Sequence, residues 1–260
     1  MPNELRISLV QTDIVWENKQ ENLFRLQKKL EELKTTTDIA ILPEMFSTGF
    51  SMKSEELAET IEGETIATIK QWSREYNFAI TGSFIASENK ACFNRAFFIT
   101  PTGDEYYYDK HHLFRMGDEP NHFQAGYKKL TFNYMDWNIC LMVCYDLRFP
   151  AWCRNIRNGY DLFIVVASWP TPRRRAWETL LCARAIENLS YVCGVNRVGT
   201  DGYGLKYSGQ STIYNAKGET LAELADGEEG ICTVNIDMES LKQLRDKFPT
   251  WKDADNFIFI

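Results

Sequence analysis

The sequence predicts an α/β fold in which mixed β-sheets carry helices on their outer faces. Apolar runs of strand length recur along the whole chain, and the longest, at 162–168, fits a single buried strand. Segments with a helical spacing of leucines separate some of these runs, whereas glycine- and proline-containing turns separate others. Because the strands alternate partly with helices and partly with hairpins, we expect both parallel and antiparallel pairing.

The first half of the chain is expected to supply five strands and two helices. Alternating or short apolar patterns predict strands at 5–11, 37–44, 78–86, 91–100 and 105–114. Leu23, Leu26 and Leu30 lie on one face of an amphipathic helix at 18–33, and a second helix is expected at 65–76. A polar loop with two glycines and a proline follows at 115–127.

The second half repeats the mixture of helices and hairpins. Strands are expected at 130–134, 137–143, 161–169, 191–199, 207–215, 218–224 and 229–236. Helices are expected at 150–158, 171–189 and 238–247, the second with Thr171 as N-cap and Pro172 at its first position. The apolar side of that helix is expected to carry four residues: Trp177, Leu180, Leu181 and Ile186.

Length and composition predict one domain, 1–260, in the cytoplasm. The 260 residues show no linker, low-complexity segment or internal repeat. The net charge of −7 argues against nucleic acid as the main partner and supplies no basic patch for anionic membranes. No run approaches the ~18 apolar residues that a membrane span needs, and the first residues contain no apolar signal block.

Cysteine and histidine usage favours a reducing compartment and gives no metal site. The seven cysteines are an odd number without CxxC spacing, and most lie in or beside apolar stretches. His111, His112 and His122 are the only histidines, too few and too scattered for a ligand cluster with cysteine. We therefore expect no metal site.

Three polar residues that follow strands can carry chemistry. Cys144 ends the apolar run 139–143, where it is either an inert core thiol or a nucleophile at the mouth of a sheet. Glu44 directly follows Pro43 at a strand end, and a carboxylate beside a thiol can act as its general base. Lys110 lies at the end of the 105–110 pattern, where it is either a surface lysine or a cation for an oxyanion. Periodicity alone does not bring the three together.

The chain resembles the nitrilase superfamily of carbon-nitrogen hydrolases, in its omega-amidase-like branch. LPEMF around Glu44, YYDKHHLF around Lys110 and VCYDLRFP around Cys144 are similar to the three signature blocks of that family, in the same order. The segment 167–199, the loop HLFRMGDE and the tail FPTWKDADNF resemble the omega-amidase-like branch. The resemblance implies a four-layer α-β-β-α sandwich, and a homodimer or higher homo-oligomer formed through helices.

The resemblance also implies a Glu-Lys-Cys triad. Glu44 would be general base and acid, Lys110 the oxyanion stabiliser, and Cys144 the nucleophile that forms a thioester. The backbone N–H of Tyr145 would be a second oxyanion donor, and this mechanism would require neither a metal nor an organic cofactor. Glu119 is the best match to the second glutamate of many members, although Asp118 is adjacent and a solvated loop acid remains the alternative.

The expected substrate is a small-molecule omega-amide resembling 2-oxoglutaramate, whose distant carboxylate needs a cation. Arg148 and Arg173 are the expected substrate-binding cations, with Phe114 and Trp169 as pocket walls. For Arg148 and for Arg184, which also lies near the site, the alternative is a structural ion pair with Asp146 or Glu187. The run 173–175 is alternatively a solvated helix start, and Phe46 and Trp177 are further walls or core residues. A nitrilase or N-carbamoyl amide hydrolase with the same triad, and a non-catalytic binding subunit, are the competing functions.

Overall fold

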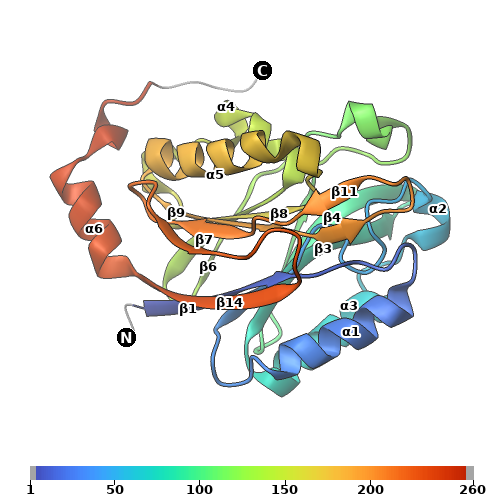
Figure 1. Ribbon diagram of the computed structural model, residues 1–260. Coiled ribbons are helices and arrows are strands. Elements are labelled where there is room, and N and C mark those ends of the chain that lie inside the picture. The colour runs from blue at the N-terminus through green and yellow to red at the C-terminus, as the bar shows by residue number, and fades with distance from the viewer. Residues whose placement is uncertain (1–3, 256–260) are drawn as a thin grey trace.

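Two six-stranded mixed sheets form the middle of the computed structural model, which describes residues 4–255 (Figure 1). The strand order of the first sheet is β14-β1-β2-β3-β4-β5. The bounds of its strands are β1 Glu4–Gln11, β2 Ile39–Ile41, β3 Ala79–Glu88, β4 Ala91–Ile99, β5 Glu105–Asp109 and β14 Gly230–Asp237. β1, β2 and β3 pair in parallel, and β4 and β5 continue the sheet as antiparallel hairpins.

The second sheet has the strand order β13-β12-β9-β8-β7-β6. Its strands are β6 Leu130–Tyr134, β7 Trp137–Val143, β8 Leu162–Ala167, β9 Tyr191–Asn196, β12 Thr212–Tyr214 and β13 Thr220–Glu223. Its three central strands, β7, β8 and β9, are parallel. A small ribbon of β10 (Val198–Thr200) and β11 (Lys206–Ser208) lies beside the two sheets.

Helices cover the outer faces of both sheets (Figure 1). α1 (Lys19–Glu31) and α3 (Glu64–Tyr76) pack on the first sheet, and α5 (Arg174–Asn188) packs on the second. α6 (Met238–Lys247) follows β14 and lies at one side of the layers, and short helices α2 (Ser54–Leu57) and α4 (Pro150–Cys153) lie in connecting segments. The expected α-β-β-α sandwich is therefore confirmed.

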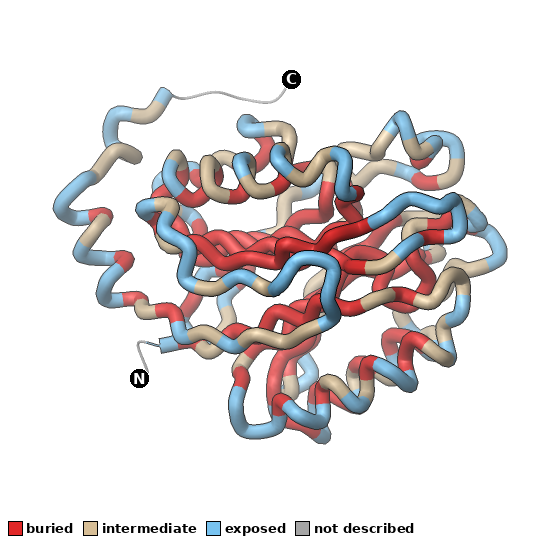
Figure 2. Tube along the Cα trace, in the orientation of Figure 1, coloured by how far each residue is buried: buried red, intermediate tan, exposed pale blue. Residues whose placement is uncertain are grey.

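The main core lies between the two sheets (Figure 2). Leu5, Ile7 and Leu9 of β1 point into it, whereas the neighbouring Val10 joins a second core beneath α1 and α3. This alternation follows from the two-residue period of a strand. β8 is buried at every position because sheet and helix cover its two faces, which explains why its sequence is apolar without alternation.

Several expected elements are shorter in the structure. The strand expected at 105–114 ends at Asp109, because the chain turns after Lys110 and the backbone N–H of His112 donates to the Asp146 carboxylate. The strand expected at 37–44 keeps only three paired residues, since the chain turns through Met45 at φ 46°. The segments expected as strands at 191–199 and 207–215 each divide between the second sheet and the small ribbon.

Two helix expectations were wrong in detail. The helix expected at 150–158 stops at Cys153, and the backbone N–H of Asn155 donates to Asn188 Oδ1 at 2.8 Å instead of continuing the helix. Thr171 makes no N-cap hydrogen bond; it begins a 3-10 turn, η5 (Thr171–Arg173), that leads into α5. Ile186 is not on the buried face of α5 but is 51% exposed. The buried face instead carries Trp177, Leu181, Arg184, Ala185 and Asn188.

The carboxyl ends of five strands meet at one edge of the sandwich. β5 runs parallel to β2 and β3 because two antiparallel pairings separate it from β3. β7 and β8 end at the same edge in the second sheet, and the backbone N–H of Glu44 donates to the carbonyl of Ala167 across the two sheets. Ligand sites of α/β folds lie outside such strand ends. Among the helices of residues 4–255, none is both long enough and apolar enough to span a membrane.

Candidate active site

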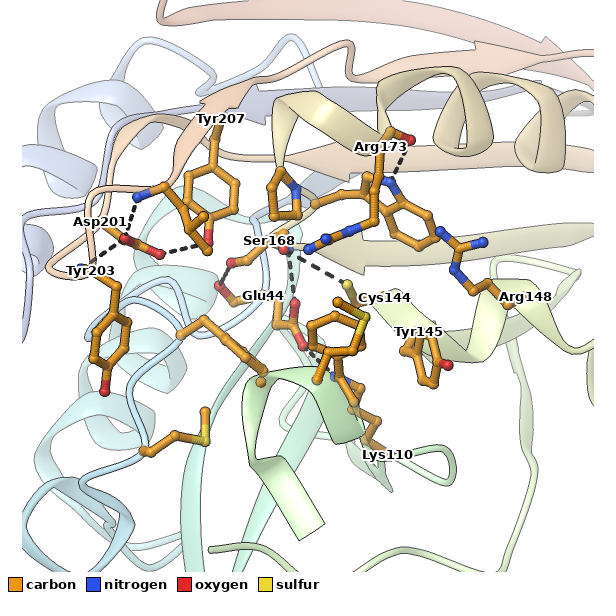
Figure 3. A pocket seen from close by; sticks show the side chains of 18 residues that line it. Glu44, Lys110, Cys144, Tyr145, Arg148, Ser168, Arg173, Asp201, Tyr203 and Tyr207 are labelled. Carbon is orange, nitrogen blue, oxygen red and sulfur yellow. Dashed lines mark hydrogen bonds and ion pairs between the residues drawn. The ribbon is translucent and has the colours of Figure 1, made fainter. Parts of the chain in front are cut away.

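Cys144 occupies a sharp turn between β7 and the 3-10 helix η3 (Cys144–Arg148). Its backbone φ of 43° lies in the left-handed region, which is unusual for a residue with a side chain and is typically retained at functional positions. The thiol is 8% exposed, and its Sγ lies 3.9 Å from the carbonyl oxygen of Ser168 (Figure 3). The turn thus directs a nearly buried sulfur toward the strand ends.

Glu44 is fully buried, and donors from three separate elements fix its carboxylate. Oε1 accepts hydrogen bonds from Lys110 Nζ at 2.9 Å and from Asn94 Nδ2 at 2.7 Å. Oε2 accepts the backbone N–H of Ser168 at 2.8 Å, which ties the first sheet to the second. The charge of the carboxylate also acts on the Cys144 thiol, whose pKa it raises. Glu44 therefore lies close enough to Cys144 to influence the proton of its thiol.

Lys110 is 1% exposed and lies between two buried carboxylates. Its Nζ is 2.9 Å from Glu44 Oε1 and 2.9 Å from Glu119 Oε2. Burial by itself lowers the pKa of Lys110, but the charges of Glu119 and Glu44 outweigh it, so the pKa lies above its ordinary value. The lysine is accordingly a permanent cation beside Cys144, which excludes the surface-lysine alternative.

Glu119 is the second glutamate of this cluster, and the solvated-loop alternative is wrong because its side chain is fully buried. Its Oε2 accepts the backbone N–H of Phe114 at 2.6 Å, and its Oε1 accepts Asn94 Nδ2 at 3.0 Å. Burial raises its pKa, and the charge of Lys110 offsets this only in part. The neighbouring Asp118 instead faces solvent, with 61% of its side chain exposed.

Asn94 and Ser168 complete the cluster and were not found by sequence reasoning. The amide of Asn94, in the middle of β4, donates to both glutamates, and the backbone N–H of Ser168 supplies the remaining donor to Glu44. Asn94 does carry a signal: together with Arg95 it interrupts a strand pattern that is otherwise mostly apolar. Ser168 carries none, because every residue type except proline has a backbone N–H.

Burial raises the pKa of the Cys144 thiol, and the Glu44 carboxylate raises it further; Lys110 lowers it without reversing the direction. The resting site therefore holds a neutral thiol next to a carboxylate, rather than a free thiolate. Such a pair can attack an electrophilic carbon only as the proton moves from sulfur to Glu44. The ammonium of Lys110 would then face the negative charge that develops on the attacked group.

A pocket with a volume of about 250 Å³ opens above the three residues (Figure 3). Every expected binding residue lines it: Phe114, Tyr145, Arg148, Trp169 and Arg173. Phe46 and Trp177 do not line it, since Phe46 packs in the core beneath α1 and α3 and Trp177 is fully buried under α5. The sequence did not predict several further lining residues, among them Met52, Met116, Asp201, Tyr203, Leu205 and Tyr207.

Arg148 and Arg173 bring two guanidinium groups to this pocket without an acid partner in the described part of the chain. Arg148 lies over the Trp169 ring at 4.7 Å, and Arg173 lies over the Phe114 ring at 5.2 Å. The structural ion pair expected as an alternative occurs at Arg184, which contacts Glu187 at 2.8 Å and lies outside the pocket. Arg174 likewise pairs with Glu178 and Asp226. The two stacked arginines thus remain free to receive an anionic group.

The comparisons with known proteins agree with this geometry. The model of the carbon-nitrogen hydrolase family matches residues 6–246. The omega-amidase YafV of Escherichia coli strain K12 is 40% identical over 253 residues, which cover 97% of this chain and 98% of that protein. The 2-oxoglutaramate amidase of Bacillus subtilis is 30% identical over 251 residues, with 95% and 96% of the two chains covered.

A solved structure matches over almost the whole length. XC1258 from Xanthomonas campestris is a CN-hydrolase superfamily protein whose crystal structure has an arsenic adduct in the active site. It is 40% identical to this chain, with a TM-score of 0.97 and 99% of both chains covered. The sandwich, including both sheets and the outer helices, is therefore shared with a protein of known structure.

The direction of the Cys144 pKa predicts how alkylation depends on pH. Only the thiolate reacts readily with iodoacetamide, and below the pKa its fraction grows with pH, so the rate should rise about tenfold per pH unit between pH 7 and 9. Glu44→Gln removes a carboxylate that raises the thiol pKa. We therefore expect faster alkylation of Cys144 at pH 7 in that variant, measured by mass spectrometry of the peptide.

The partly exposed Cys182 provides an internal reference for reagent access in the same experiment. An alkylation rate of Cys144 that stays level from pH 7 to 9 in the unaltered protein would contradict the raised pKa. Slower alkylation in Glu44→Gln than in the unaltered protein would contradict the assigned influence of the carboxylate.

Proposed function

The chain belongs to the carbon-nitrogen hydrolase family, and we propose that it is an omega-amidase that hydrolyses the terminal amide of a short dicarboxylic acid monoamide. The observation that carries the proposal is the buried cluster of Glu44, Lys110 and Cys144 at the floor of a pocket that also holds two unpaired arginines. Relatives that act on omega-amides at 30–40% identity over most of the chain support the same substrate class.

In the first half of the reaction, the sulfur of Cys144 attacks the amide carbon while Glu44 accepts the thiol proton. The carbonyl oxygen becomes an oxyanion, which the Lys110 ammonium and the backbone N–H of Tyr145 stabilise. Glu44 then gives its proton to the amide nitrogen as the carbon–nitrogen bond breaks. Ammonia leaves, and the acyl group remains on Cys144 as a thioester.

In the second half, a water molecule attacks the thioester carbon and gives a proton to Glu44. Lys110 again faces the oxyanion. The carbon–sulfur bond breaks, Glu44 returns the proton to the sulfur, and the carboxylic acid is released. Glu119 holds Lys110 throughout, because its carboxylate accepts from the lysine ammonium. The overall reaction consumes one water and yields one carboxylate and one ammonium ion at neutral pH.

Substrate choice follows from the upper part of the pocket. Arg173 reaches from the start of α5 toward Ser168, above the thiol, and Arg148 lies beside Trp169 (Figure 3). A guanidinium without an acid partner binds a carboxylate through paired, charge-assisted hydrogen bonds. A substrate with an amide at one end and a carboxylate at the other, such as 2-oxoglutaramate, satisfies both ends of the pocket.

We also propose that residues 1–260 form one hydrolase domain that works in the cytoplasm. The family match over residues 6–246 supports a single domain. All seven cysteines lie in the described part of the chain and form no disulfide, which suits a reducing compartment.

The triad roles are tested by three variants and an amide panel. Cys144→Ala should lower ammonia release from 2-oxoglutaramate by about 10⁴-fold or more, because the nucleophile is lost. Glu44→Gln should lose turnover comparably. Lys110→Met should lower kcat by about 10²–10³-fold through loss of oxyanion stabilisation. Thermal unfolding is followed alongside, because removing the cation leaves two buried carboxylates unpaired.

Two matched controls accompany these variants. Cys182→Ala changes a partly exposed thiol of α5 that does not line the pocket, and Lys129→Met removes a half-buried lysine that donates to the carbonyl of Arg154, away from the pocket. Both should keep turnover near normal. Near-normal activity of Lys110→Met would overturn its role, and faster turnover of a nitrile or an N-carbamoyl substrate than of any omega-amide would overturn the substrate class.

The role of Arg173 predicts a separation between binding and chemistry. Arg173→Met should raise the KM for 2-oxoglutaramate by about 10–100-fold, as expected for the loss of a charge-assisted hydrogen-bonded pair. The KM for butyramide, which has no carboxylate, should change little. Arg175→Met is the control, because Arg175 lines an outer groove rather than the pocket. Equal effects on both substrates would argue against carboxylate binding by Arg173.

We propose that the protein forms a homodimer through the outward face of α5. That face leaves Ile186 51% exposed although the rest of the helix packs on the second sheet. We expect sedimentation equilibrium to give about twice the chain mass of 30.2 kDa, and Ile186→Glu to shift the protein toward the monomer. Ile156→Glu, at a similarly exposed residue outside α5, should leave the mass unchanged. A monomeric unaltered protein would refute the proposal.

A further inference from the structure

Asp146 is a fully buried carboxylate two residues after Cys144, and the mechanism above does not use it. It lies in η3 and does not line the pocket, so it does not meet a substrate. Four donors nevertheless point at its two oxygens. Oδ1 accepts the backbone N–H of His112 at 2.8 Å and the ring Nδ1 of the same residue at 2.9 Å. Oδ2 accepts the Tyr108 hydroxyl at 2.7 Å and the backbone N–H of Val143 at 3.3 Å.

The positions of these donors along the chain connect the two halves of the site. Tyr108 and His112 stand two residues before and two residues after Lys110, on β5 and in the turn that follows it. Val143 directly precedes Cys144 at the end of β7. One carboxylate therefore binds the side chain of Tyr108 before the lysine, the backbone of His112 after it, and the backbone of the residue next to the nucleophile, across the boundary between the two sheets.

The direction of each hydrogen bond is fixed by its surroundings. The Tyr108 hydroxyl oxygen already accepts Trp152 Nε1 at 3.0 Å and the backbone N–H of His111 at 3.3 Å, so its own proton is left for Asp146. Because an ionised carboxylate only accepts, Nδ1 of His112 must carry a proton as well. All four contacts thus require two acceptor oxygens at residue 146, which a neutral amide does not have.

Aromatic stacking holds the same segment in place. The His111 ring stacks on Trp152 with centroids 3.8 Å apart, and the His112 ring stacks on Phe149 with centroids 3.6 Å apart. Phe149 and Trp152 follow Asp146 on the nucleophile side, whereas both histidines follow Lys110. The ring stacking and the hydrogen bonds of the Asp146 carboxylate therefore join the same two segments, the one around Lys110 and the one that follows Cys144.

We infer that Asp146 is a positioning residue, whose carboxylate sets the placement of the Lys110 ammonium relative to the Cys144 sulfur. The inference rests on the proposed roles of Lys110 and Cys144. The turn that presents Cys144 has a positive φ, and the strand that presents Lys110 ends just before it, so neither residue is held by regular sheet pairing on both sides. Asp146 replaces that missing pairing. A displacement of about 1 Å in a reacting group costs roughly 10²-fold in rate.

The test is the full-length Asp146→Asn variant, which keeps the side-chain shape but replaces one acceptor oxygen with a donor. Either orientation of the amide leaves two donors facing its NH₂ group. Asp161→Asn is the matched control: Asp161 is also buried, with an arginine and Asn138 as partners, but it precedes β8 at the end opposite Ser168. Tyr108→Phe is the second variant, since it removes one donor while Asp146 remains.

Steady-state kinetics, thermal unfolding and iodoacetamide alkylation are measured on the unaltered protein and on the three variants Asp146→Asn, Asp161→Asn and Tyr108→Phe. We expect Asp146→Asn to lower kcat by about 10²-fold with KM changed by less than about threefold, because the binding wall is untouched. Tyr108→Phe should show a smaller loss of kcat of the same kind. The pH profile of Cys144 alkylation should move upward in both variants, since a displaced ammonium stabilises the thiolate less. Asp161→Asn should lower thermal stability without changing kcat or the alkylation profile.

Three outcomes would overturn the inference. The first is a normal kcat and alkylation profile in Tyr108→Phe together with a folded, fully active Asp146→Asn. The second is a loss of kcat in the control Asp161→Asn that matches its loss of stability. The third is a change in Asp146→Asn that is confined to KM. Failure of the proposed function is recognised separately. In that case Cys144→Ala and Lys110→Met do not affect turnover of the amide, whereas the alkylation profile still reports the effect of Asp146 on Cys144.

Discussion

The buried ammonium of Lys110 between the carboxylates of Glu44 and Glu119 is the interaction on which the rest of the site depends. A cation and two anions far from water are costly unless every group has partners. Asn94, the N–H of Ser168 and the N–H of Phe114 supply those partners to the two carboxylates. Because these donors come from both sheets and from the loop after β5, charge compensation requires the native packing of the sandwich.

The sandwich in turn explains why the cluster can form. Strands β2, β5, β7 and β8 deliver their carboxyl ends to one edge, and each is followed by a site residue: Glu44, Lys110, Cys144 or Ser168. β2 and β8 are buried at every position and β7 at all but one, so packing against another layer on either side holds these three strand ends rigidly. The chain turns out of the sheets immediately afterwards, which places polar groups at the edge while the apolar core remains intact.

Sequence reasoning recovered the parts of the site that depend on residue type and not those that depend on conformation. Glu44, Lys110 and Cys144 follow strand patterns and lie in recognisable family motifs, so their meeting at one edge of the sheets was readable, whereas their catalytic roles stay a prediction. The choice between Asp118 and Glu119 was not, because φ of 62° at Asp118 turns one acid outward and the next inward. Ile186 was misplaced for a similar reason: Arg184 is buried through bonds to Leu147 and Glu187, and an apolar pattern does not anticipate a buried arginine.

The same cluster that stabilises the site also restrains its nucleophile. Glu44 and burial keep the Cys144 thiol protonated at rest, and Lys110 offsets them only partly. A thiolate present at rest would react with any electrophile that enters the pocket. A neutral thiol instead reacts once a carbonyl is held near Lys110, because stabilisation of the developing oxyanion offsets the cost of moving the thiol proton to Glu44. In the proposed reaction, selectivity then arises at two levels: the arginines of the pocket admit an anionic amide, and the ammonium permits attack only where its charge is needed. Both levels depend on fixed distances, which is why buried groups without contact to the substrate, such as Asn94 and Asp146, matter to the chemistry.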